Sequence, residues 1–153
     1  MYRSPALRGW VIARLSVTEE TGTPGLVLSD RMAIITDVVR EGWLRVTLVP
    51  GGTSSLPAGV AEAAGELVIS GEELQDYLLF SGDDNPVHRG DRPILPALLL
   101  LERLLAKRQP PCPFDARFLR PVYAGQPLRL EEEKNTLTAF HSDGVVLLRI
   151  MFP

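Results

Sequence analysis

An aspartate and a histidine, Asp83 and His88, flank an Asn85-Pro86 turn and are separated by only a few residues. The chain contains just two histidines, and one of them is used here. A carboxylate and an imidazole held close together suit general acid–base catalysis, because one group accepts a proton while the other donates one. The spacing therefore predicts acid–base chemistry in the loop at residues 82–88.

A structural interpretation of the same loop stays open from these residues alone. Asp83 and Asn85 are also typical turn residues, since Asp and Asn close to a proline favour loops for backbone reasons. A single histidine such as His88 is more often a hydrogen-bonded structural residue than a catalyst. The wider sequence has to decide between these two interpretations.

The composition limits the class of protein. A chain of 153 residues suits one domain with its own core, and a net charge of −3 gives no reason to expect a nucleic-acid partner. The one cysteine, Cys112, allows no internal disulfide, which favours a cytoplasmic location. Residues 1–8 do not resemble a signal peptide, and the longest apolar run, residues 93–101, is too short to cross a membrane. No ligand cluster or glycine-rich phosphate loop is present, so we expect no metal and no redox cofactor.

Two helices are expected to position the loop. Ser70 and Glu73 form a capping box at the start of the first helix, and Gly82 is suited to end it. The second helix, residues 97–107, follows Pro96 and is apolar nearly all round, so we expect a sheet to wrap it.

Strands are predicted on both sides of these helices, from apolar alternation and turn residues. In the first half they cover residues 10–17, 26–28, 32–39, 43–49 and 66–69, with a loop at 51–57. In the second half they cover residues 116–123, 128–133, 136–141 and 145–152, with a hairpin turn at 142–144. His141 is expected beside that exposed turn without a role, and the acidic run at residues 131–133 is expected to face water.

Three blocks of the chain, residues 69–88, 93–99 and 114–125, resemble the MaoC-like hydratases, which include the R-specific enoyl-CoA hydratases of the hot-dog fold. The first block contains Asp-x-Asn-Pro-x-His at residues 83–88. The resemblance implies an α+β hot-dog fold, in which a curved antiparallel sheet wraps around a long central apolar helix. A single domain, residues 1–153, would have a family-like core at residues 63–153. The β-rich segment at residues 1–62 would complete the sheet or be the remnant of a first hot-dog repeat.

The resemblance also implies an activity, the reversible hydration of a trans-2-enoyl thioester to a 3-hydroxyacyl thioester. Asp83 and His88 would hold the catalytic water, and Asn85 would orient the substrate or the pair. The backbone amide of Ala97 would bind the enolate oxygen. The substrate would be a thioester of coenzyme A or of an acyl carrier protein, with no cofactor, and the protein would be a homodimer without nucleic-acid or membrane partners.

Departures from the family pattern keep other functions open. Only residues 89–92 separate His88 from Pro93, where the family has a longer segment, and Pro96-Ala97 replaces a histidine and a glycine. A non-catalytic or accessory protein that binds acyl thioesters, or a hot-dog acyl-CoA thioesterase, are the alternatives. Four arginines could contact the phosphates of coenzyme A or of a carrier protein's phosphopantetheine: Arg89, Arg92, Arg117 and Arg120. Taken singly, each is more simply explained as solvated surface charge.

Overall fold

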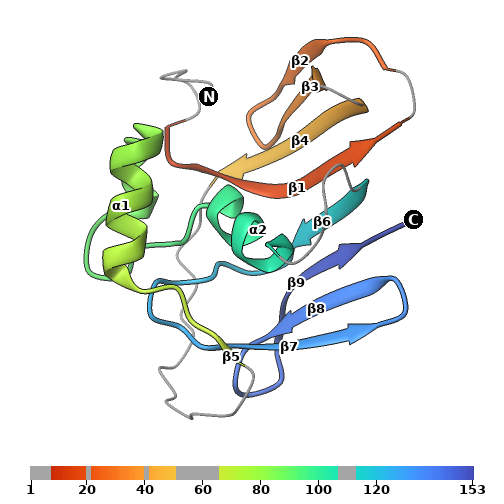
Figure 1. Cartoon of the computed structure of the whole chain (residues 1–153). Helices are drawn as coiled ribbons and strands as arrows, with labels where there is room; N and C mark the ends of the chain where they lie inside the picture. The colour runs from red at the N-terminus through yellow and green to blue at the C-terminus, as the bar shows by residue number, and fades with distance from the viewer. Residues whose placement is uncertain (1–7, 20–21, 40–41, 51–65, 107–112) are drawn as a thin grey trace.

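The computed structural model describes residues 8–19, 22–39, 42–50, 66–106 and 113–153. In these ranges the chain forms a curved sheet of nine strands, with α2 (Ala97–Leu105) against its concave face and α1 (Gly71–Ser81) beside it (Figure 1). Neither helix is long and apolar enough to span a bilayer. The loop expected at residues 51–57, the end of the second predicted helix and Cys112 lie outside the described residues.

All strand pairs of the sheet are antiparallel, in the order β2-β3-β4-β1-β6-β9-β8-β7-β5. The N-terminal strands are β1 (Trp10–Thr18), β2 (Gly25–Leu28), β3 (Ala33–Val39) and β4 (Gly42–Pro50). The short β5 (Glu66–Leu67) forms the far edge. The C-terminal strands are β6 (Phe114–Phe118), β7 (Leu128–Glu133), β8 (Thr136–Phe140) and β9 (Val146–Met151).

One strand pair joins the two halves of the chain. β1 lies against β6 in a register that sets Leu15 opposite Ala116, and both side chains are buried on the concave face. The N-terminal strands therefore extend the sheet that the C-terminal strands build. The single-domain assignment and the family-like core at residues 63–153 stay predictions.

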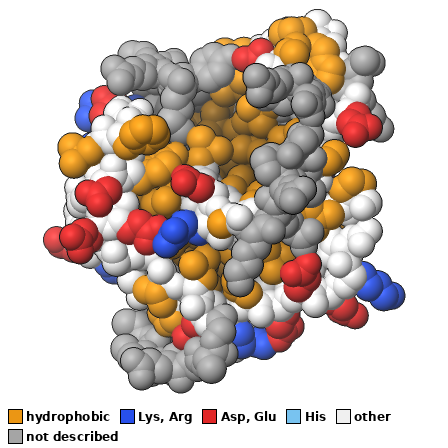
Figure 2. Space-filling view, viewed as in Figure 1, with side chains coloured by type: hydrophobic (Ala, Val, Ile, Leu, Met, Phe, Trp, Pro, Cys, Tyr) orange, Lys and Arg blue, Asp and Glu red, His pale blue; other side chains and the backbone are white. Residues whose placement is uncertain are grey.

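The prediction of a long central helix is wrong, because α2 has only nine residues. It is also amphipathic rather than apolar all round. Glu102 and Arg103 face solvent, and the Leu98 side chain is 37% exposed. The leucines that pack against the sheet and α1 are Leu99, Leu100, Leu101 and Leu104. Since such a helix is about 14 Å long, it covers only part of the concave face, and Figure 2 shows hydrophobic side chains around a hollow on this side.

The first helix forms as its capping residues predict, with one difference. Ser70 Oγ accepts a hydrogen bond of 3.1 Å from the amide of Glu73, and Gly82 ends the helix in the left-handed region at φ 63°. The Glu73 carboxylate, however, pairs with Arg103 Nε at 2.7 Å. This side chain therefore ties α1 to α2, where the capping box predicts a contact with the backbone of Ser70.

The C-terminal strands show one further difference. β6 ends at Phe118 and not at residue 123, because the amides of Leu119 and Arg120 both bond to the carbonyl of Leu147 and the next residue is a proline. His141 lies beside the hairpin turn as predicted, and its side chain is buried, which the prediction does not specify. Residues 131–133 are exposed at the end of β7, as predicted.

Candidate functional site

The loop after α1 brings Asp83 and His88 together. Gly82 ends the helix, and a short 3₁₀ turn, η2 (Pro86–His88), then carries the histidine back towards the aspartate. His88 Nε2 lies 3.7 Å from Asp83 Oδ2, and the two side chains are only 9% and 13% exposed. A separation this long exceeds a direct hydrogen bond, so the two groups face each other across a narrow gap.

A backbone carbonyl orients the ring of His88. Its Nδ1 atom lies 2.6 Å from the carbonyl oxygen of Ile94. Because a carbonyl oxygen only accepts, Nδ1 carries the proton in this hydrogen bond. In the neutral tautomer that this bond favours, the lone pair of Nε2 is directed towards Asp83, an arrangement suited to a general base.

The carboxylate of Asp83 is shared between the turn and the histidine. Its Oδ1 atom accepts a hydrogen bond of 3.0 Å from the amide of Asn85, while Oδ2 faces His88. The backbone of Asp83 is fixed as well, since its amide donates to Ser81 Oγ at 3.3 Å and its carbonyl accepts from Arg89 at 2.9 Å. The two interpretations of Asp83 are thus compatible. Oδ1 stabilises the turn, and Oδ2 is left for acid–base chemistry with His88.

Asn85 fastens the loop to the first strand. Its Oδ1 atom accepts from the amide of Gly9 at 3.1 Å and from that of Val87 at 3.4 Å, and its Nδ2 donates to the carbonyl of Trp10 at 2.8 Å. These bonds occupy the side-chain amide with backbone groups. The expected role of Asn85, orientation of the substrate or of the Asp83–His88 pair, stays a prediction. The link to Gly9 and Trp10 is absent from the sequence interpretation.

Ala97 begins α2 close in sequence to the residue that holds His88. Ile94, whose carbonyl accepts from the histidine, is itself fixed by a bond of 2.9 Å from its amide to the carbonyl of Val87. The N-cap residue is Pro96, which supplies no side-chain hydrogen bond to the first turn. The first amides of a helix lack partners within the helix and lie at its positive dipole end. The start of α2 is therefore chemically suited to an oxyanion.

Tyr77 is a residue near the site that the sequence interpretation did not single out. It is half-buried on α1, and burial raises the pKa of its hydroxyl, with further contributions from the negative charges of Asp83 and Glu102. The hydroxyl therefore stays a proton donor near Asp83. The influence of Asp83 depends on how the loop folds back beside α1, which the helical spacing of Tyr77 does not reveal.

Three of the four arginines considered as candidate phosphate contacts, Arg89, Arg92 and Arg117, have partners in the protein. Arg89 donates to the loop, and the Arg92 guanidinium lies 4.6 Å from the ring centroid of Tyr123. Arg117 lies 3.6 Å from Asp115, and Arg120 is exposed. Nothing in these contacts separates a phosphate site from ordinary surface charge.

Solved structures resemble this chain in fold. HtdX from Mycobacterium tuberculosis matches with a TM-score of 0.65 and 17% sequence identity, over 94% of this chain and 76% of that chain. An acyl-ACP thioesterase from Bacteroides thetaiotaomicron matches with a TM-score of 0.50 and 12% identity, also over 94% of this chain and 76% of that chain. No protein-family model and no curated protein matches the sequence. The likenesses show the fold, a large antiparallel sheet with few helices that fits the hot-dog architecture.

Proposed function

We propose that this chain is a MaoC-like hydro-lyase that hydrates trans-2-enoyl thioesters to 3-hydroxyacyl thioesters, and catalyses the reverse dehydration. The observation that carries the proposal is the buried Asp83–His88 pair, with Nε2 and Oδ2 3.7 Å apart. Two atoms at this distance can each contact one water oxygen at about 2.8 Å. The fold, and the family resemblance of residues 83–88, support the same activity.

The reaction follows from the two basic atoms of the pair. A water between His88 Nε2 and Asp83 Oδ2 gives up a proton to the pair while its oxygen forms a bond to Cβ of the enoyl group. The electrons of the double bond move towards the thioester carbonyl, and the pair returns a proton to Cα. Atoms balance, since one water is added across the double bond. Dehydration uses the same groups in the opposite order.

The thioester oxygen gains negative charge in this step, and Ala97 is the proposed donor. Its amide is the first of α2, where the helix dipole favours an anion. Alanine retains the N–H that glycine would supply, and adds a β-carbon beside the oxygen. We expect this β-carbon to restrict the substrates that fit, together with the short connection at residues 89–92.

Thioester hydrolysis is the second candidate, favoured by the likeness to an acyl-ACP thioesterase. The products separate the two reactions. Hydrolysis releases a free thiol, whereas hydration removes the enoyl absorbance without releasing thiol. A third candidate, an accessory protein that binds acyl thioesters without turnover, would show binding and neither product.

The first experiment follows the absorbance of crotonyl-CoA, and of a longer enoyl-CoA, with the wild type and with His88→Ala. Loss of absorbance with the wild type only would support hydration at this loop. Equal rates with both proteins, or thiol release without loss of the enoyl group, would contradict it. Circular dichroism of both proteins checks that each is folded.

The proposed enzyme is a homodimer, since the sheet leaves edge strands β2 and β5 that a second copy could cover. The exposed apolar side chains of β2, Leu26, Val27 and Leu28, favour such a contact. Light scattering over a dilution series tests it, and a monomeric mass at every concentration would contradict it. The choice between coenzyme A and a carrier protein, and the cytoplasmic location, stay predictions.

A further inference from the structure

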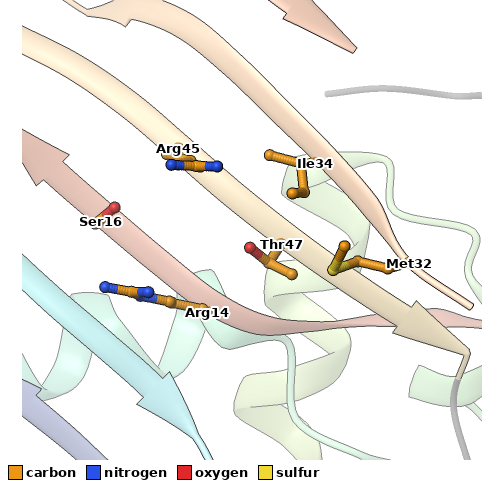
Figure 3. A pocket seen from close by; sticks show the side chains of 6 residues that line it. All are labelled: Arg14, Ser16, Met32, Ile34, Arg45 and Thr47. Atoms are coloured by element: carbon orange, nitrogen blue, oxygen red, sulfur yellow. The ribbon is translucent and has the colours of Figure 1, made fainter. Parts of the chain in front are cut away.

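The outer face of the sheet, opposite α2, carries a pocket that the proposed catalytic site does not use. Its volume is about 320 Å³. Figure 3 shows the pocket on the outer face of the N-terminal strands, with the helices behind the sheet. Its lining side chains are Arg14, Ser16, Met32, Ile34, Arg45 and Thr47.

The strand register explains the chemistry of this pocket. Arg14 on β1 lies opposite Thr47 on β4, and Ser16 lies opposite Arg45, so two guanidinium groups alternate with two hydroxyls. Guanidinium groups bind phosphate oxygens with paired hydrogen bonds, and hydroxyls add further donors. Among the described residues Arg45 has no ion-pair partner, so its charge is available to a ligand.

The positive charge continues across the next two strands. Arg14 lies opposite Arg117 on β6, and Arg117 lies opposite Arg149 on β9, so three arginines stand in one cross-strand row. Like charges directly opposite each other destabilise a sheet. The side chains of Arg14 and Arg117 are about half exposed, at 49% and 50%, and Arg149 is exposed as well.

Within the described part of the chain, one carboxylate on this face contacts the row. Asp115 accepts two hydrogen bonds from Arg14, from Nε at 2.8 Å and from Nη2 at 2.5 Å, and lies 3.6 Å from Arg117. Arg14 therefore offers a ligand only its remaining N–H groups, and Arg45 supplies the pocket with a guanidinium that no carboxylate of the described residues engages. Beyond the row in the same register, Glu131 on β7 is separated from Arg149 by Thr138 and pairs with Arg129. Four arginines on this face, the three of the row and Arg45 in the pocket, thus outnumber the one carboxylate that contacts the row. The chain as a whole has a net charge of −3.

We propose that the outer face of β4, β1, β6 and β9 binds a small ligand that carries two or more phosphate groups. One phosphate lies in the pocket between Arg14 and Arg45, and the next lies along the row towards Arg117 and Arg149. Since neighbouring strands are about 4.8 Å apart, the row from Arg14 to Arg149 is about 10 Å long, which is more than one phosphate needs. Met32 and Ile34 provide an apolar wall for an organic part of the ligand.

Titration calorimetry at low salt tests the site, with pyrophosphate and ADP as probes and orthophosphate for comparison. We expect pyrophosphate and ADP to bind the wild type more tightly than orthophosphate does, and to bind more weakly as salt rises. Tighter binding of ADP than of pyrophosphate would show that the site also recognises an organic group attached to the phosphates. Equal binding assigns recognition to the phosphate groups alone, and both results support the site.

Single charge removals locate the binding. Arg45→Gln and Arg149→Gln should each weaken pyrophosphate binding about tenfold, while Lys134→Gln removes one positive charge from an exposed turn and should leave it unchanged. Absence of binding to the wild type, or equal affinity of Arg45→Gln, Arg149→Gln and the wild type, would overturn the proposal. His88→Ala should bind as the wild type does, so this result is independent of the hydratase assay.

Thermal stability gives a second readout. Without ligand and at low salt, Arg149→Gln should raise the Tm, because it removes repulsion from Arg117, and salt should diminish the difference. A variant that binds pyrophosphate less well and is yet more stable identifies Arg149 as a ligand-binding residue. A lower Tm would assign it a structural role and contradict the proposal.

Discussion

His88 and Asp83 face each other at 3.7 Å, and each is held in place through its other polar atom. The histidine uses Nδ1 on the carbonyl of Ile94, and the aspartate uses Oδ1 on the amide of Asn85. The two atoms that remain, Nε2 and Oδ2, point into the same narrow space. The backbone therefore fixes both orientations, and this is the preorganisation that the proposed acid–base catalysis requires.

Replacing Asp83 with Asn should abolish most of the turnover without unfolding the loop. The amide oxygen of the new side chain can still accept from the amide of Asn85, while the proton-accepting carboxylate is lost. We expect kcat/KM for a converted enoyl-CoA to fall about 10²- to 10⁴-fold. The matched control is Asp84→Asn, because Asp84 is exposed on the same loop. Similar losses in both variants would show that the loop tolerates no change of charge, and that Asp83 has no special role.

Replacing Asn85 with Ala should loosen the connection between the loop and β1. The variant leaves the amide of Gly9 and the carbonyl of Trp10 without their partner, and we expect a loss of about 1–3 kcal/mol in the free energy of unfolding. Urea denaturation measures this loss. Hydrogen exchange should show a more labile amide at Gly9 and little change in β8. Unchanged exchange at Gly9 would contradict the connection.

The hairpin turn at Asp143 should contribute stability that depends on pH. The hydrogen bond from the amide of Val145 lowers the pKa of Asp143 below its ordinary value of 3.8, and the bond to His141 adds to this effect. A carboxyl group with a lowered pKa in the folded state stabilises the protein above its unfolded pKa, and the contribution is lost as the pH falls through the folded pKa.

Thermal unfolding of the wild type and of Asp143→Ala over a pH series measures this contribution. We expect the difference in Tm to shrink once the pH falls below about 4. Other carboxyl groups titrate equally in both proteins and cancel in the difference. A difference that persists unchanged at the lowest pH would show that the charge of Asp143 has no part in it.

Two neighbouring leucines of α2 should respond differently to truncation. Leu100 is 2% exposed within the core, and we expect Leu100→Ala to lower the free energy of unfolding by about 2–5 kcal/mol. Leu98 is 37% exposed on the same helix, and Leu98→Ala should cost less than about 1 kcal/mol. Chemical denaturation of both variants tests this. Equal costs would mean that a partner covers Leu98 in solution.

Local sequence predicts the parts of this fold that depend on local contacts. Ser70 and Gly82 mark the two ends of α1, because caps are contacts between residues close in sequence. The limits of β7 are also as predicted. The end of β6 is different, since it depends on the carbonyl of Leu147 on a strand that comes later in the chain.

The same distinction applies to the site. The types and spacing of Asp83 and His88 are visible in the sequence, and so is the turn between them. The carbonyl of Ile94 that orients the ring, and the backbone of Gly9 and Trp10 that holds Asn85, carry no side-chain signal. The leucine content of α2 suggests a helix that is apolar nearly all round, and it conceals the solvent-facing Glu102 and Arg103.

The pairing of β1 with β6 has a consequence for how the chain folds. Arg14 and Asp115 meet across a sequence separation of 101 residues, and the N-terminal strands join the C-terminal strands of the sheet through this pairing. Contacts this distant in sequence slow folding, since a long loop must close before they form. During synthesis, β1 leaves the ribosome long before its partner strand exists. Until β6 is synthesised, the β1 edge that pairs with it has unpaired backbone groups. Chaperones or rapid completion of the chain would protect this edge from aggregation.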